Sequence, residues 1–247
     1  MARSLHLALF IALTLSITSS QVVPYDFYVF ATFWLGSVCR TTQCLANQTS
    51  KAAPNFWMVH GLWPQISGGP NPAFCTNTTA FDPNLLGPQL LNMTNTFWVS
   101  ANTSNDYFHT HEWDKHGTCW NDPINPHNET NKLKNYFSTS ILYSISLSIY
   151  NILAMNSIVP RSEPYQLKDF SNVFNKQPLW KNNSYVMSCS YDKDGNQYFS
   201  DLYLCLDLNM KIMACPDGLE STFPNVCNAG TTYYTPLNVS QIEMVTI

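Results

Sequence analysis

The stretch "DLYLCLDLNMKIMACP", Asp201–Pro216, shows how the last third of this 247-residue chain folds. Leucines alternate with other side chains over Leu202–Leu208, and a period of two predicts a half-buried β-strand. Asn209–Lys211 is a plausible turn, so a hairpin around it sets Cys205 opposite Cys215. Directly opposed residues approach closely enough for a disulfide, which we predict here.

A long helix is predicted before this hairpin, over residues 133–155. Apolar residues at four-residue intervals are typical of a helix with one face in the core; they are Phe137, Ile141, Ile145 and Ile149. Asn156 and Pro160 end the pattern. Near the N-terminus, Tyr28–Trp34 and Phe56–Val59 are predicted strands. A long helix followed by strands predicts an α+β domain.

The first twenty residues are typical of a secretory signal peptide, with a retained N-terminal anchor as the alternative. Arg3 is followed by the short apolar run Leu5–Ile17 and by small residues before Gln21. No later stretch reaches about 18 apolar residues, so we expect no membrane association after the signal is removed. Residues 21–247 then form one domain.

Eight cysteines follow the signal, and an even number in a secreted chain predicts four disulfides. Zinc ligation is the weaker alternative, because paired C-x-x-C knuckles are absent from the sequence. Seven N-x-S/T sequons agree with a secretory route; they begin at Asn47, Asn77, Asn92, Asn102, Asn128, Asn182 and Asn238.

The charge of the chain argues against a stable nucleic-acid complex. Without Arg3 the mature chain has 11 basic and 16 acidic side chains, a net charge near −5. It has no run of lysine or arginine that would hold a polyanion by counterion release. A polyanionic substrate is therefore expected to bind locally and transiently.

"HEWDKHGTC", His111–Cys119, concentrates ionisable groups in a chain of which only 11% is charged. If the stretch is helical, Glu112, Lys115 and His116 lie at i, i+3 and i+4 on one face. His111 neighbours Lys115 at i+4. One turn of helix would then present a carboxylate, an ammonium and one or two imidazoles to the same small volume.

Two other chemistries for this stretch are weaker. A zinc helix needs histidines at i and i+4, whereas His111 and His116 are five residues apart, about 140° around a helix. We therefore predict no metal site. Cys119 as a nucleophile is disfavoured because the even cysteine count suggests that it is bridged, and the chain has no G-x-S-x-G motif.

A second motif, "FWMVHGLWP" at Phe56–Pro64, carries His60 after a predicted strand. A lone histidine at a strand end is more often structural. Combined with His116, it supplies a second imidazole of pKa near 6.5, so that one can act as base and the other as acid. Trp63 and Phe108 can supply stacking faces for bases, whereas core packing is favoured for Trp57 and Trp113.

These side chains suit the cleavage of RNA by its own 2′-hydroxyl. One histidine removes the 2′ proton, the oxygen attacks phosphorus, and the other histidine protonates the leaving 5′ oxygen. A lysine can stabilise the charge that develops. Acid, base and cation are all side chains, so no metal or cofactor is needed, and DNA is refused for lack of the nucleophile.

"HGLWP" and "HEWDKHGTC" resemble the two signature blocks of the ribonuclease T2 family, secreted or vacuolar endoribonucleases. The resemblance implies a central, mainly antiparallel sheet flanked by helices, and we expect the protein to be a monomer. It implies cleavage to 2′,3′-cyclic phosphates and slower hydrolysis to 3′-phosphates. By the same resemblance, His116 matches the general base and His60 the general acid, His111 binds phosphate, and Glu112 and Lys115 steady the phosphorane.

The resemblance also implies the cysteine pairs Cys39–Cys44, Cys75–Cys119, Cys189–Cys227 and Cys205–Cys215. It implies a destination outside the cell or in the lysosome or vacuole.

The alternative to a plain RNA-degrading enzyme is a secreted recognition or toxin-like module of the self-incompatibility type, which the acidic net charge disfavours. Departures from the family pattern fall at Phe33, Leu35, Gln65 and His109. They leave the catalytic set complete and bear on base preference.

Overall fold

The computed structural model describes residues 24–75, 79–122, 129–180 and 183–238. The predicted signal peptide and the sequons at Asn77, Asn128 and Asn182 lie outside these ranges. The strands are β1 (Phe27–Phe33), β2 (Met58–Gln65), β3 (Tyr165–Gln166), β4 (Tyr185–Tyr191), β5 (Gln197–Leu206) and β6 (Thr231–Thr232). The helices are α1 (Leu35–Thr41), α2 (Ala46–Thr49), α3 (Pro83–Leu86), α4 (Pro88–Phe97), α5 (Asn105–Lys115), α6 (Glu129–Leu147), α7 (Ile149–Ala154) and α8 (Leu167–Asn175), with 3-10 turns at Gly117–Cys119 and Leu219–Thr222.

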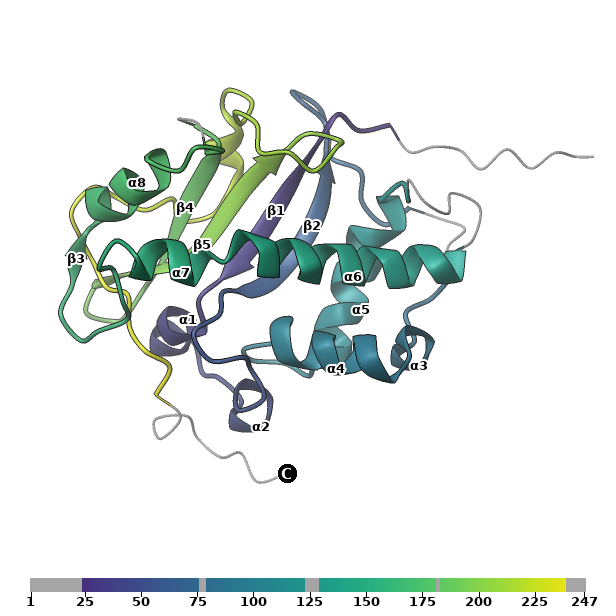
Figure 1. The fold of residues 1–247 in the computed structure, drawn as a ribbon, viewed down its shortest axis with the longest axis horizontal. Helices are drawn as coiled ribbons and strands as arrows, with labels where there is room; N and C mark the ends of the chain where they lie inside the picture. Colours follow the sequence, from purple (N-terminus) through teal and green to yellow (C-terminus); the bar gives the residue numbers. More distant parts are fainter. Residues whose placement is uncertain (1–23, 76–78, 123–128, 181–182, 239–247) are drawn as a thin grey trace, which may run out of the picture.

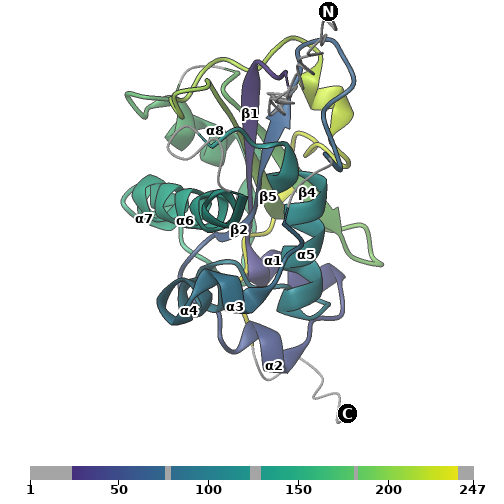
Figure 2. The same cartoon turned by 90° about the vertical axis from the view of Figure 1, so that its right-hand side faces the viewer.

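Four strands form the central sheet in the order β2-β1-β5-β4, and every neighbouring pair is antiparallel. Helices α6 and α7 cross one side of this sheet (Figure 1). Figure 2 shows the sheet nearly edge-on, with α6 and α7 on one side and α5 on the other. The prediction of an α+β fold with an antiparallel sheet flanked by helices is confirmed.

The sheet is buried on both faces at its centre. All seven residues of β1 are buried, and β5 is buried at every position except Asp201. The expectation of a half-buried strand over Leu202–Leu208 is therefore wrong: Tyr203 and Cys205 belong to a second apolar cluster on the opposite face from the leucines. The strand ends at Leu206, and Leu208 is exposed.

The predicted helix over residues 133–155 is broken in the structure. Ser148, with φ +49°, separates α6 from α7. A spacing of four drifts by about 40° per step from the helical period of 3.6, so Ile145 turns out of the core and is exposed. The buried positions of α6 follow the true period; they are Leu133, Tyr136, Phe137, Ser140, Ile141 and Ser144.

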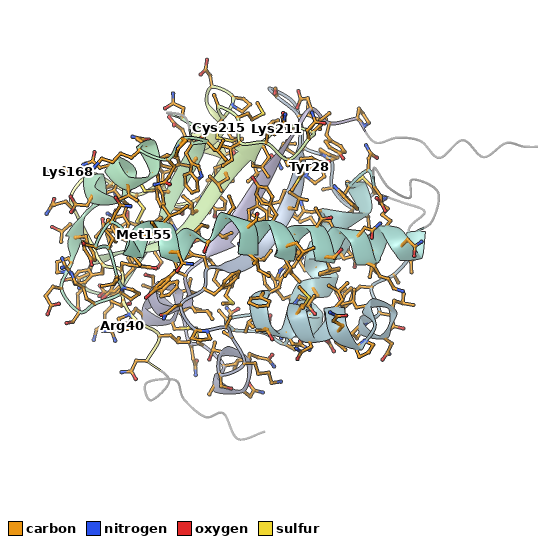
Figure 3. The ribbon with its side chains drawn as sticks, viewed as in Figure 1. Tyr28, Arg40, Met155, Lys168, Lys211 and Cys215 are labelled. Atoms are coloured by element: carbon orange, nitrogen blue, oxygen red, sulfur yellow. A yellow bond between two sulfur atoms is a disulfide. The ribbon has the colours of Figure 1, made fainter. Side chains whose placement is uncertain are left out.

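By length and composition, residues 131–154 would also suit a membrane span, a test that the core helix of a soluble protein can pass too. The Phe137 and Ile141 face of this segment packs in the core. Met155, just beyond α7, lies on the surface (Figure 3).

Four disulfides close the fold, and they are the pairs that the family resemblance implies: Cys39–Cys44, Cys75–Cys119, Cys189–Cys227 and Cys205–Cys215. The hairpin after β5 turns at Met210, which has a φ of +61°. Leu206, before this turn, pairs with Ile212, after it. Cys75–Cys119 fixes the end of the motif His111–Cys119, which begins within α5, to the loop before α3.

Candidate active site

His60 lies inside β2, not after a strand as the sequence suggested. The pairing of β1 with β2 runs from Ala31–Gly61 directly to Thr32–Val59, which leaves His60 as the extra residue of a β-bulge. A bulge re-aims a side chain out of the regular alternation. The imidazole of His60 is about one-third exposed, its Nε2 lying 3.7 Å from Glu112 Oε1.

Gly61 allows Glu112 to approach the strand. A Cβ at this position would collide with Glu112 Oε2 and with Trp63 Nε1. The absent side chain thus leaves the space in which the indole N–H of Trp63 donates a 2.8 Å hydrogen bond to Glu112 Oε2. The hydroxyl of Tyr136 holds the same strand from α6, since it donates to the carbonyl of Leu62.

Helix α5 presents the second motif. Its N-cap is Ser104, whose hydroxyl accepts a hydrogen bond from the Tyr107 amide. Glu112 is buried, and His111, one residue earlier, is exposed. His116 is the C-cap and is also buried. The prediction that this stretch is helical is confirmed up to Lys115.

The indole of Trp63, a residue of the first motif, contacts side chains of both motifs. Its indole stacks on the imidazole of His116 with ring centroids 5.0 Å apart and planes 25° apart. It meets the His60 ring edge to face at 5.1 Å. The structure therefore brings His60, Glu112 and His116 around one indole. Trp57 and Trp113 are buried, as predicted for core residues.

The pKa values of His60 and His116 are shifted in opposite directions. Burial lowers the pKa of His60, but Asp201 and Glu112 outweigh it, so the pKa is raised overall. The pKa of His116 is lowered to about 2 by burial and by the charges of Lys115, His60 and His111. In mildly acid solution His60 is the imidazole that holds a proton and His116 the one that is free to accept one.

The pKa values of Glu112 and His111 are also shifted by burial and by nearby charges. Burial raises the pKa of Glu112, although His60 and the Trp63 N–H oppose the shift. Burial and the Lys115 charge lower the pKa of His111. Lys115 is thus close enough to act electrostatically on every other member of the predicted catalytic set.

A cavity of about 420 Å³ opens beside His60. Phe33 and Phe108 give it apolar walls, and His60 and His111 line it together with Asp201. The ring of Phe108 lies 5.6 Å from that of His60. This hollow has the volume of a small-molecule pocket and is lined by two of the predicted catalytic histidines.

His109, where the family resemblance sets a tryptophan, is a core residue. Its Nε2 lies 2.7 Å from the carbonyl oxygen of Trp98, and its pKa is lowered to about 4, chiefly by burial. Gln65, a second departure, is buried at the end of β2 with its amide donating to the carbonyl of Pro64. Neither side chain lines the cavity described above.

Sequence reasoning missed Asp201, whose Oδ1 lies 3.9 Å from His60 Nδ1. The alternation of β5 places Asp201 on the face of Tyr203 and Cys205, which was expected to be the solvent face. Only the pairing of β1 with β5, which sets Asp201 opposite Phe33, shows that this face meets the motif histidine. Among the described residues, no group of three or more His, Cys, Asp or Glu side chains is arranged to hold a metal ion.

Comparison with known proteins gives one consistent family. The model of the "Ribonuclease T2 family" matches residues 25–215. "Ribonuclease DdI" of Dictyostelium discoideum is 32% identical over 202 residues, which are 81% of this chain and 82% of that one. "Ribonuclease 1" of Arabidopsis thaliana is 28% identical, over 84% of this chain and 90% of the relative. The crystal structure of RNase NT in complex with 5′-AMP superposes with a TM-score of 0.69 at 25% identity, covering 87% of this chain and all of that one.

Proposed function

Because this chain belongs to the ribonuclease T2 family, we propose that it is an endoribonuclease that cleaves single-stranded RNA through the 2′-hydroxyl beside the scissile phosphate. The first products are 2′,3′-cyclic phosphates, which the enzyme hydrolyses more slowly to 3′-phosphates. The observation that carries the proposal is the grouping of His60, Glu112 and His116 around Trp63.

The opposite pKa shifts of the two histidines support one direction of proton transfer. His116, with a lowered pKa, is neutral and accepts the 2′ proton, whereas His60, with a raised pKa, gives its proton to the leaving 5′ oxygen. A pKa near 2 would make His116 a weak base. The substrate phosphate brings negative charge into the site, however, and negative charge raises the pKa of a nearby imidazole.

Lys115 and Glu112 then act on the phosphorane. Its equatorial oxygens gain charge as the 2′ oxygen attacks, and an ammonium fixed beside them stabilises that charge. Burial raises the pKa of Glu112, so this carboxyl group is protonated more readily than an exposed one and can donate to a phosphoryl oxygen. His111 is exposed beside Lys115 and can hold the same phosphate from the solvent side.

The position of the cavity suggests where the two nucleosides lie. The leaving 5′ oxygen belongs to the nucleoside on the 3′ side, and this oxygen must be next to the acid. The cavity lined by His60, Phe33 and Phe108 is therefore the place for that leaving nucleoside. The 2′ oxygen belongs to the nucleoside on the 5′ side and must lie next to His116. The base of that nucleoside is therefore expected beside Trp63, whose indole contacts His116.

The cellular route follows from the leader alone. Residues 1–20 would direct the chain into the secretory pathway, where the four disulfides form. The final destination is then the extracellular space or the lysosome or vacuole. In either place the enzyme acts as a monomer that binds RNA transiently, without a metal or a cofactor.

The test is RNA cleavage by His60→Ala and His116→Ala, measured as release of acid-soluble nucleotide at pH 5–7. Each variant should lose about 10²- to 10⁴-fold in rate, the range that one positioned acid or base contributes. His109→Gln is the control, because this histidine lies in the core and its replacement keeps a donor toward the Trp98 carbonyl. Full activity in both alanine variants, with native circular dichroism, would refute the assignment.

A further inference from the structure

Asp201 faces His60 from β5, a strand that carries neither signature motif. Its Oδ1 lies 3.9 Å from His60 Nδ1. We propose that Asp201 is a positioning residue that orients the imidazole of His60 and stabilises its protonated form. The proposal rests on the function proposed above, in which His60 is the acid that protonates the leaving 5′ oxygen.

Each of these residues lies at or next to a β-bulge, on strands that are separated by β1. One bulge leaves His60 unpaired in β2. The other lies where β4 pairs with β5: the register skips Ser200 and resumes with Asp201. The bulge takes His60 out of the regular alternation of β2, as bulges next to active sites often do. Asp201 keeps the alternation of β5, and its pairing with Phe33 of β1 brings it beside His60.

Ser200 fixes the carboxylate from behind. Its hydroxyl donates a 2.7 Å hydrogen bond to Asp201 Oδ2, and the serine is buried. The same hydroxyl lies 3.3 Å from the carbonyl oxygen of Ser188 on β4. With Oδ2 held in this way, Oδ1 is the oxygen directed at the imidazole.

The Nδ1 atom of His60 needs this partner. It is buried and has no hydrogen-bond partner among the residues that the structure describes. The 3.9 Å separation exceeds hydrogen-bond length, but catalytic hydrogen bonds are often long before substrate binds. When Nδ1–H points at Asp201, Nε2, which lies 3.7 Å from Glu112 Oε1, is the nitrogen left to donate a proton in the site.

The surroundings of His60 have opposing effects on its protonation. Asp201 from β5 and Glu112 from α5 favour its protonated form, whereas burial and Lys115 oppose it. His111 and His116 also interact with the charge of His60, which lowers their own pKa values. Burial raises the pKa of Glu112, which reduces its negative charge in acid solution. Removing the Asp201 charge should therefore lower the pKa of His60.

The test is Asp201→Asn, which keeps the shape of the side chain and removes its charge. The pKa of His60, followed by NMR titration of its ring protons, should fall by about one unit or more, the effect of one opposite charge at this range. The alkaline limb of the kcat profile should move to lower pH by the same amount, while the acid limb stays in place. At neutral pH kcat should fall about tenfold, with KM within about twofold.

Asp194→Asn, the same change in the exposed turn between β4 and β5, should move neither limb. Ser200→Ala, which frees the carboxylate, should shift His60 in the same direction by a smaller amount. Asp201→Glu, which restores the charge, should recover part of the shift. An unchanged His60 titration and alkaline limb in Asp201→Asn and Ser200→Ala would overturn the proposal. If the wild-type chain does not cleave RNA, the proposed function fails, whereas the NMR titration still tests the Asp201–His60 pair.

Discussion

The indole of Trp63 donates a 2.8 Å hydrogen bond to Glu112 Oε2 while its face stacks on the imidazole of His116. One side chain therefore covers two of the proposed catalytic groups in the free protein. With Oε2 held in this way, Oε1, which lies 3.7 Å from His60 Nε2, is the oxygen of Glu112 that is left to meet a phosphate. The hydrogen bond from Trp63 joins strand β2 to helix α5, so it also links the stability of the fold to the state of the site.

Replacing Trp63 by phenylalanine should destabilise the protein in a pH-dependent way. The variant loses a donor to a buried carboxyl group, which costs about 1–3 kcal/mol when the group is ionised and less when it is protonated. The Trp63 N–H lowers the pKa of Glu112, so the loss of unfolding free energy relative to wild type should grow as the pH rises. Urea unfolding between pH 4 and 8 measures it.

Trp113→Phe is the matched control. Its indole N–H donates 2.7 Å to the carbonyl oxygen of Thr79, which does not titrate. The deficit of this variant should stay constant with pH. If the loss of unfolding free energy in Trp63→Phe is also constant with pH, the hydrogen bond from Trp63 does not depend on the ionisation of Glu112, and the prediction is wrong.

Gly61→Ala should impair catalysis more than folding. The new Cβ displaces Glu112 Oε2 and the Trp63 indole, and a shift of about 1 Å at a catalytic group can cost 10²-fold in rate. We expect kcat to fall by about that factor, with a loss of about 1–3 kcal/mol in stability from overpacking. Gly69→Ala, in an exposed loop where the nearby atoms belong to the Ile66 side chain, should retain activity. Unchanged kcat in Gly61→Ala would contradict the close approach.

Two features of the site show what the sequence could and could not predict. The spacing of Glu112, Lys115 and His116 fixed their common helical face, because a helix has one period. Gly61 beside His60 is a local sign of a bulge, but the position of the bulge was not predicted because it depends on how β1 pairs with β2. For the same reason Asp201 was missed: its distance from His60 is set by two strand registers.

The fold divides in the same way. The alternation of leucines in β5 predicted a strand correctly, but the burial of Tyr203 and Cys205 required the second apolar cluster, which includes Phe27 and Val29 from the other end of the chain. The helix α6 was predicted, although the spacing of four misplaced Ile145, whereas the break at Ser148 was not predicted. Local patterns thus predicted which elements form, and long-range packing decided where they end.

His109 should make the protein less stable in acid. Its pKa is about 4 in the folded state, against about 6.5 when unfolded, so the unfolded chain binds its proton first. Stability from the neutral, buried imidazole is complete above pH 6.5 and declines as the pH falls to about 4, by about 3 kcal/mol in all. Urea unfolding of His109→Gln should show a flatter pH dependence in this window. Identical slopes for both proteins would contradict the shift.

Asn102 combines a sequon with a place in the cavity wall. It is exposed and lines the cavity beside His60 and His111. In protein produced through a secretory pathway, a glycan here should raise KM for long RNA more than for a dinucleotide. Asn102→Gln should remove this difference, whereas Asn92→Gln, which changes the exposed asparagine of a sequon on α4, should not. Mass spectrometry that finds Asn102 unmodified would remove the basis of the prediction.

The central claim is that RNA is cut by its own 2′-oxygen between two histidines, without a metal. The most direct measurement is ³¹P NMR of a defined dinucleotide digested in the presence of EDTA, beside the same dinucleotide with a 2′-deoxy sugar at the scissile position. A 2′,3′-cyclic phosphate that forms first and then decays to the 3′-phosphate, with the deoxy analogue intact, is the predicted result. Cleavage of the deoxy analogue, or loss of activity in EDTA, would contradict the account.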